Sequence, residues 1–82
     1  MPQADEAEAL AEYARLIARF GDSDHPELRG WVARAMFNRA AAVDASGDEA
    51  EALAEYARLV ARFEGCNISE VLKIVEEAKK RL

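Results

Sequence analysis

The chain has 82 residues, a formal net charge of −5 and a pI of about 4.8, and 51% of its residues are hydrophobic. This length fits one domain, and the composition is that of a folded protein rather than a disordered one. The acidic charge argues against nucleic-acid binding, and no apolar run approaches the ~20 residues that a membrane span requires. With one cysteine and one histidine, we expect no internal disulfide, metal, cofactor or catalytic site, and therefore no enzyme.

An internal repeat is the strongest feature of the sequence. Residues 5–20 (DEAEALAEYARLIARF) and residues 48–63 (DEAEALAEYARLVARF) are identical at fifteen of sixteen positions, at an offset of 43 residues. An offset of this size is typical of stacked helical units, and such close identity indicates that one unit was duplicated. Apolar residues recur at spacings of three and four in both copies, which predicts an amphipathic helix for each.

The first half of the chain contains signals for two helices. We expect the first helix over residues 4–20, where Asp5 and Glu8 match a capping box. We expect the second over residues 26–46, capped by Asp24. The expected apolar row of this second helix consists of Leu28, Val32, Ala35, Met36 and Val43, with Trp31 and Phe37 beside it.

The second half repeats these signals and then departs from them. We expect a third helix over residues 48–64, where Asp48 and Glu51 form the same box, and a fourth over residues 68–82. The candidate caps of the fourth helix are Asn67 and Ser69. Its expected apolar row consists of Ile68, Val71, Leu72, Val75, Ala78 and Leu82. The glycines expected to end helices in a left-handed conformation are Gly21 and Gly65.

These elements predict an all-α fold of four antiparallel helices, stacked as right-handed helical hairpins in one domain over residues 1–82. The hairpin of residues 33–63 resembles a tetratricopeptide repeat of the long, Ala/Arg-rich bacterial type. The residues that carry this likeness are Ala40, Gly47, Ala52, Tyr56, Leu59 and Val60. The resemblance extends over residues 5–63, as one full hairpin preceded by a lone second helix.

The likeness is incomplete, and it also implies a candidate site. The period of 43 exceeds the family's period of about 34 residues, and Gly65-Cys66-Asn67 replaces the family's proline. In the family the first helices line a groove, where a basic residue and an asparagine one turn apart hold a peptide carboxylate. Arg34 and Asn38 match these positions. The resemblance therefore implies a partner-binding surface made of Arg34, Phe37, Asn38 and Ala41.

The composition changes abruptly near residue 64. All three lysines lie in the last ten residues, whereas seventeen of the eighteen alanines precede residue 62. We interpret the C-terminal segment as a capping helix of separate origin, engineered onto a truncated natural repeat. A natural protein with a divergent last helix is the alternative.

Other polar residues have simpler explanations than a site. Loop and helix capping account for the cluster of Asp22, Asp24 and His25 better than a metal does. Cys66 begins the last helix without a partner for nucleophilic chemistry, and a buried small apolar residue, or a handle for labelling or crosslinking, explains it.

Two function classes follow. The first is a non-catalytic helical scaffold, engineered and without a native ligand, and the second is an interaction module that binds a peptide or protein through an exposed helix face. A third interpretation makes the C-terminal helix a designed binder, with Lys73 and Ile74 at its surface. The uncovered first helix predicts a homodimer, by two-fold pairing or helix exchange. Because the N-terminus lacks signal-peptide features, we expect a cytoplasmic protein, or a recombinant design without a native compartment.

Overall fold

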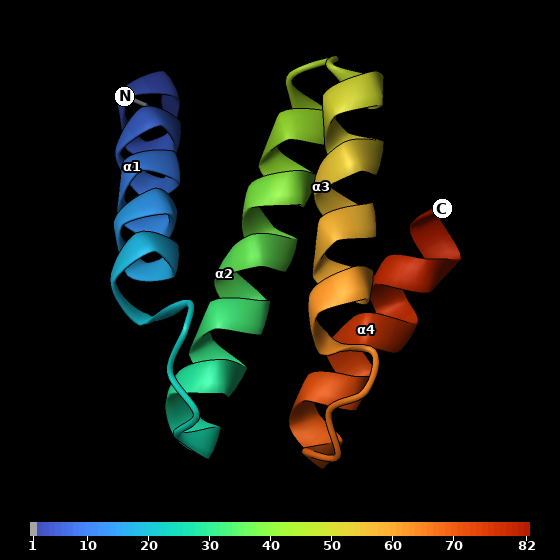
Figure 1. Ribbon diagram of the computed structural model, residues 1–82. Helices are drawn as coiled ribbons and strands as arrows, with labels where there is room; N and C mark the ends of the chain where they lie inside the picture. Colours follow the sequence, from blue (N-terminus) through green and yellow to red (C-terminus); the bar gives the residue numbers. More distant parts are fainter. Residues whose placement is uncertain (1) are drawn as a thin grey trace.

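The computed structural model describes residues 2–82, with side chains described from residue 8 onward. The fold over these residues is all-α, as predicted, and contains no strand. The helices are α1 (Pro2–Phe20), α2 (Pro26–Ala45), α3 (Glu49–Phe63) and α4 (Ser69–Arg81). Figure 1 shows successive helices running in alternating directions, with α1 at one side of the molecule and α4 at the other.

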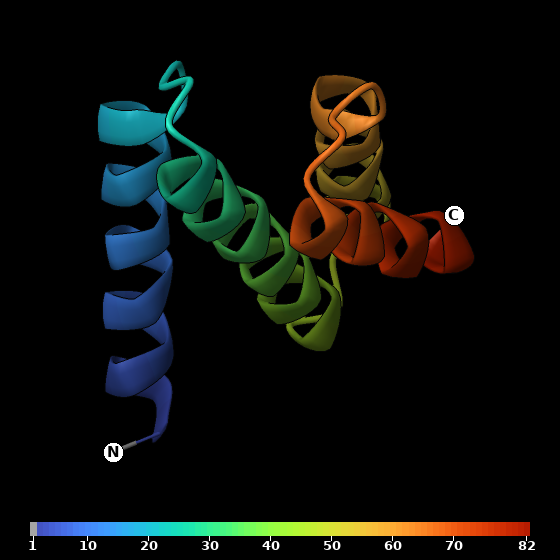
Figure 2. The same ribbon diagram turned by 90° about the horizontal axis from the view of Figure 1, so that it is seen from below.

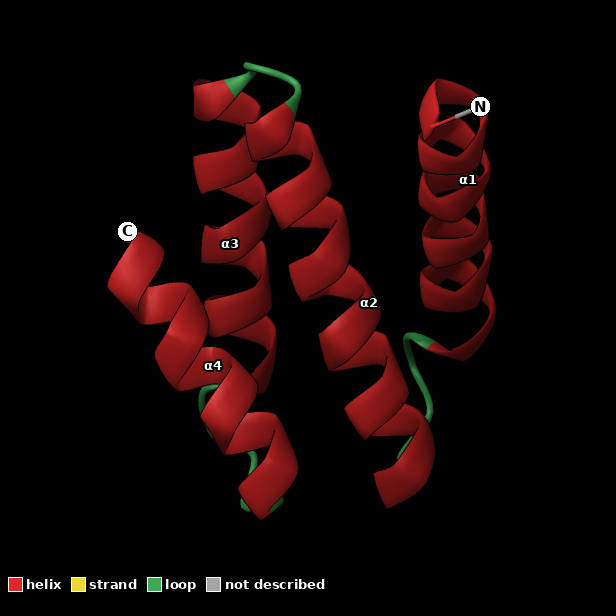
Figure 3. Ribbon diagram, turned by 180° about the vertical axis from the view of Figure 1, so that it is seen from behind, coloured by secondary structure: helices red, strands yellow, loops and turns green. Residues whose placement is uncertain are grey.

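Helix α2 is the centre of the arrangement. Within the described residues, α1, α3 and α4 all pack against α2, and α4 also packs against α3. In the part of the chain that the structure describes, helix α1 has no helix neighbour other than α2, and Figures 2 and 3 show it standing apart from α3 and α4. The molecule measures 37 × 26 × 16 Å along its principal axes, so it is an elongated array rather than a closed four-helix bundle.

The core lies where α2, α3 and α4 meet. Its fully buried large side chains come from all three helices, and they are Val32, Tyr56, Leu59, Phe63, Val71 and Val75. Alanines fill further buried positions of the core, where a methyl side chain is small enough for two helices to pack closely. These alanines are Ala33, Ala40, Ala52 and Ala78, each at most 1% exposed.

Some large apolar residues of the predicted rows lie outside this core. Trp31 is 56% exposed on α2, and Leu72 and Leu82 are exposed on α4. Both leucines belong to the apolar row expected for the last helix, but the structure leaves them exposed. Val71, Val75 and Ala78 are the buried residues of α4, and half-buried Ile74 packs beside them, whereas the two leucines lie at the exposed edges of this face.

The N-terminal side-chain cap predicted from the sequence forms at α3, but the caps predicted at α2 and α4 do not form. The Asp48 carboxylate accepts a hydrogen bond from the Glu51 N–H at 3.2 Å, as predicted. Helix α2 instead begins after His25, whose side chain forms no cap, with Pro26 presetting the first turn. Helix α4 begins after Ile68, which packs against the core, so apolar burial sets this start rather than a side-chain cap. The box expected at Asp5 lies outside the described side chains.

The glycines also act differently from the prediction. Gly47, between α2 and α3, has a φ of 99° and is the one described residue in the left-handed region, so Gly21 and Gly65 do not adopt it. Gly21 is required for a different reason. A Cβ there would press against the Ile17 carbonyl oxygen and contact the Arg62 side chain, whereas Gly65 has open space around it.

The two copies of the repeated helix occupy different environments. Tyr56, Leu59 and Phe63 of α3 are at most 1% exposed. Their counterparts in α1, which are Tyr13, Leu16 and Phe20, are only half-buried. Because the sequences are nearly identical, the difference comes from the neighbours: α3 packs against both α2 and α4, and α1 against α2 alone.

This difference predicts unequal costs for one substitution made in each copy. Leu59→Ala should lower the free energy of unfolding by about 3 kcal/mol, because it leaves a cavity in the core. Leu16→Ala should lower it by about 1 kcal/mol, because solvent already reaches that side chain. Urea denaturation of both variants measures the difference. Equal losses would contradict the described packing of α1.

Candidate functional site

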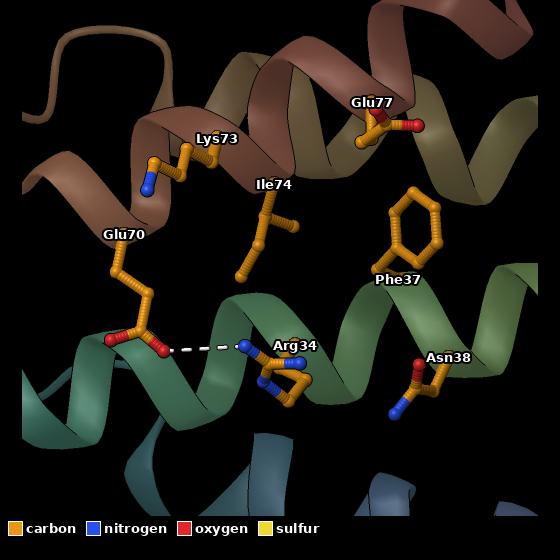
Figure 4. Close-up of a pocket in the computed structure, with 7 residues that line it drawn as sticks. All are labelled: Arg34, Phe37, Asn38, Glu70, Lys73, Ile74 and Glu77. Carbon is orange, nitrogen blue, oxygen red and sulfur yellow. Dashed lines mark hydrogen bonds and ion pairs between the residues drawn. The ribbon is translucent and has the colours of Figure 1, made fainter.

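A groove lies between α2 and α4 on the described surface. It has a volume of about 270 Å³. Its lining residues are Arg34, Phe37 and Asn38 from α2, and Glu70, Lys73, Ile74 and Glu77 from α4. Figure 4 shows Ile74 pointing from α4 toward α2, and Phe37 pointing from α2 toward α4.

The floor of this groove is apolar and held in place by aromatic contacts. Phe37 packs edge-to-face on Tyr56, with ring centroids 5.4 Å apart. The Arg81 guanidinium lies over the Phe37 ring at 5.2 Å from its centroid, in a cation–π contact. Ile74 packs against the core from the other side. Phe37 is thus a half-buried ring with a fixed orientation, available to an apolar side chain of a partner.

The rim of the groove carries charges of both signs. Arg34 and Glu70 form an ion pair across it at 3.2 Å, which Figure 4 marks, and both side chains are exposed. Glu77 pairs with Lys80 at 3.4 Å on the same helix. Exposed ion pairs of this kind stabilise a fold little, so these groups can exchange their partners for those of a ligand.

The structure brings three of the four predicted site residues together. Arg34, Phe37 and Asn38 line the groove, whereas Ala41 is half-buried on α2 and does not line it. The resemblance missed the wall that α4 supplies. The residues of that wall fall at the spacings of three and four that place side chains on one helix face, and they are Glu70, Lys73, Ile74 and Glu77. The sequence shows this spacing, but it does not indicate which helix this face of α4 packs against.

A second, smaller hollow of about 180 Å³ lies between α1 and α2. It shares Arg34 and Asn38 with the first groove, so α2 contributes to both. Its apolar lining comes from Tyr13, Leu16, Trp31 and Ala35. The large exposed ring of Trp31 lies at this hollow and is not covered by the described chain.

A third hollow, of about 250 Å³, lies at the end of α2 and the start of α3. Its lining residues are Asp44, Glu49, Ala52, Leu53, Tyr56 and Arg81. Tyr56 is 1% exposed, and its hydroxyl is buried without a hydrogen-bond partner among the described residues. An unsatisfied buried hydroxyl destabilises a core.

The polar loop residues and the cysteine are placed as follows. Asp22 is exposed and pairs with Arg62 at 3.3 Å, and the His25 N–H donates to the Ser23 hydroxyl at 3.1 Å. Cys66 is half-buried and packs against the core. Among the described residues, no three metal-binding side chains of the His, Cys, Asp or Glu type lie together. No helix of the described chain has the length and apolarity needed to cross a membrane.

Comparisons with known proteins give no relative. No protein-family model matches the chain, and neither a curated protein nor a solved structure is significantly similar to it.

The unsatisfied Tyr56 hydroxyl can be tested by its removal, and Tyr13, its counterpart in the first copy of the repeat, serves as the control. Tyr56→Phe should leave stability unchanged or raise it by up to about 1 kcal/mol, because it removes a buried polar atom and keeps the ring. Tyr13→Phe should change it by less than about 0.5 kcal/mol, since Tyr13 is half-buried. Thermal and urea unfolding measure both. A loss above about 1 kcal/mol for Tyr56→Phe would show that the hydroxyl has a stabilising partner.

Proposed function

We propose that the protein is a non-catalytic helical scaffold, engineered from a duplicated helix and closed at one end by a C-terminal helix of separate origin. The division of α4 into two faces carries this proposal. Val71, Val75 and Ala78 are at most 2% exposed against the core. The exposed side bears charges, which are Lys73, Glu76, Glu77, Lys79, Lys80 and Arg81.

A helix with these two faces is what a stack of helical units needs at its end. Each unit of such a stack exposes an apolar face to the next, so the last unit requires a polar outer side. The composition change at residue 64 falls at the loop between α3 and α4, where a cap would be joined. Lys79 also pairs with Glu64 at 3.5 Å, which ties α4 back to the end of α3.

Polar contacts between the other helices fit the same function. The Glu55 side chain is 5% exposed and lies 2.6 Å from Arg58 and 3.9 Å from Arg39, which links α3 to α2. Arg62 of α3 donates to the Gly21 carbonyl oxygen in the loop between α1 and α2. These contacts join α3 to α2 and to the loop that follows α1.

The groove between α2 and α4 supports a second candidate, a module that binds a peptide or protein. The observation that favours it is an apolar floor of half-buried Phe37 and Ile74. The floor is flanked by the cations Arg34 and Lys73 and by the acids Glu70 and Glu77. An apolar floor with a few charged groups around it is the usual composition of a ligand site. A peptide with a bulky apolar residue beside a free C-terminal carboxylate fits this chemistry.

The scaffold proposal predicts that the inner face of α4 determines the stability of the whole chain. Val75→Asp should cost more than about 3 kcal/mol, because it buries an unpaired charge. The neighbouring Leu72→Asp should cost less than about 1 kcal/mol, because this side chain is exposed. Thermal melts followed by circular dichroism measure the stability of both variants. Binding of a hydrophobic dye shows whether the core has become exposed. If Val75→Asp released α4 while residues 2–63 melted unchanged, α4 would not close the scaffold.

The second candidate predicts saturable peptide binding. A labelled peptide Gly-Ser-Ala-Leu with a free C-terminal carboxylate should bind in fluorescence anisotropy, and its C-terminal amide should bind more weakly. Lys73→Glu should weaken binding about tenfold by charge repulsion, while Lys79→Glu, outside the groove, should not. A peptide that shows no saturable binding at millimolar concentration leaves the scaffold proposal in place and contradicts this candidate.

A further inference from the structure

Over residues 8–19, the outer face of α1 consists of charged residues and alanines that no other described helix covers. Its members, called the outward stripe below, are Glu8, Ala11, Glu12, Arg15, Ala18 and Arg19, and all are exposed. They recur at spacings of three and four, so they form one continuous row opposite the residues that face α2. Figure 2 shows no other helix on the far side of α1.

The second copy of the repeat shows how this row behaves when a helix does cover part of it. Glu55 of α3, the counterpart of Glu12, has a side chain only 5% exposed, beside Arg39 of α2 and its own Arg58. Glu12 pairs with Arg15 at 2.8 Å in the same way, but its side chain is 69% exposed. The same sequence thus buries its glutamate where a neighbouring helix supplies an arginine. In α1 no helix of the described chain does so.

The order of charges along the outward stripe identifies what could supply that arginine. Both acids, Glu8 and Glu12, lie in the first part of the stripe, and both cations, Arg15 and Arg19, lie in the second part. A second α1 in antiparallel orientation reverses this order, so each acid meets a cation. A parallel second copy would place like charges opposite each other, which disfavours association.

One two-fold axis satisfies both charge pairs. With the axis level with the midpoint between residues 13 and 14, Glu8 lies opposite the partner's Arg19, and Glu12 lies opposite the partner's Arg15. Ala11 and Ala18 lie in the same stripe. Because alanine side chains are short, they allow the two helix axes to approach to about 8 Å.

We propose that the outward stripe of α1 is a self-complementary surface that pairs two copies of this chain as an antiparallel, two-fold dimer. Such an interface uses the same surface on both subunits, so assembly stops at two copies. The contacts are mostly ionic and lie near solvent, so the dimer should be weak and sensitive to salt.

Analytical ultracentrifugation of the full chain tests the proposal. At low salt, the weight-average mass should rise from 9.1 kDa to about twice that value between micromolar and millimolar concentration. High salt should raise the dimer dissociation constant about tenfold or more, because it screens exposed charge pairs. A wild-type protein that stays monomeric throughout would overturn the proposal.

Charge reversal gives a sharper test, because each half of the stripe can be changed separately. Glu8→Arg/Glu12→Arg makes the stripe wholly basic, and Arg15→Glu/Arg19→Glu makes it wholly acidic. Each double variant should remain monomeric, and an equimolar mixture of the two should recover the dimer. Circular dichroism melts check that both variants keep the fold, as expected for exposed positions.

Matched controls separate this surface from an effect of net charge. Glu76→Arg/Glu77→Arg and Lys73→Glu/Lys80→Glu make the same changes of charge on α4 and should dimerise like the wild type. If the controls lost the dimer as well, or if the α1 variants kept it, the proposal would be wrong. Loss of the dimer on Trp31→Ala but not on charge reversal would place the interface at the hollow between α1 and α2 instead.

Discussion

The fold depends on the burial of one face of α3 between α2 and α4. Helix propensity alone holds a short isolated helix weakly, so most of the stability of α3 comes from this packing. Tyr56, Leu59 and Phe63 are the large side chains that α3 buries in the core it shares with α2 and α4. Helix α1 carries nearly the same residues without a second neighbour, so its apolar row stays half-exposed. The sequence of the repeated helix determines which apolar side chains are available for burial. The neighbouring helices determine how many of them are buried.

The surface features follow from that arrangement. Since α4 reaches both α3 and α2, it leaves a groove along α2 in which Phe37 and Ile74 remain accessible. The charged residues divide into those that join helices, such as Glu55 and Arg62, and those that face solvent. This division is consistent with a scaffold whose helices are fixed while its outer faces stay open to partners.

Much of this could be predicted from the sequence. Periodicity, alanine content and breaks near residues 21–25, 46–48 and 64–68 were sufficient for four helices whose expected ends lie within two residues of those observed. The starts of α2 and α4 were less predictable, because Pro26 and the burial of Ile68 replace side-chain caps there. The α4 wall of the groove could not be assigned, since the residues of one helix face do not indicate which helix they will meet.

The contact between Arg62 and the Gly21 carbonyl oxygen has a consequence for motion. In a linear array, a unit with one neighbour opens more easily than a unit between two. Helix α1 is such a unit, but Gly21, the residue that follows its C-terminal end, accepts this hydrogen bond from Arg62 of α3. Within residues 8–20, opening of α1 should therefore start at the end farther from Gly21. Amide hydrogens of the repeated segment should exchange more slowly in α3 than in residues 8–20 of α1, although the two copies are nearly identical in sequence.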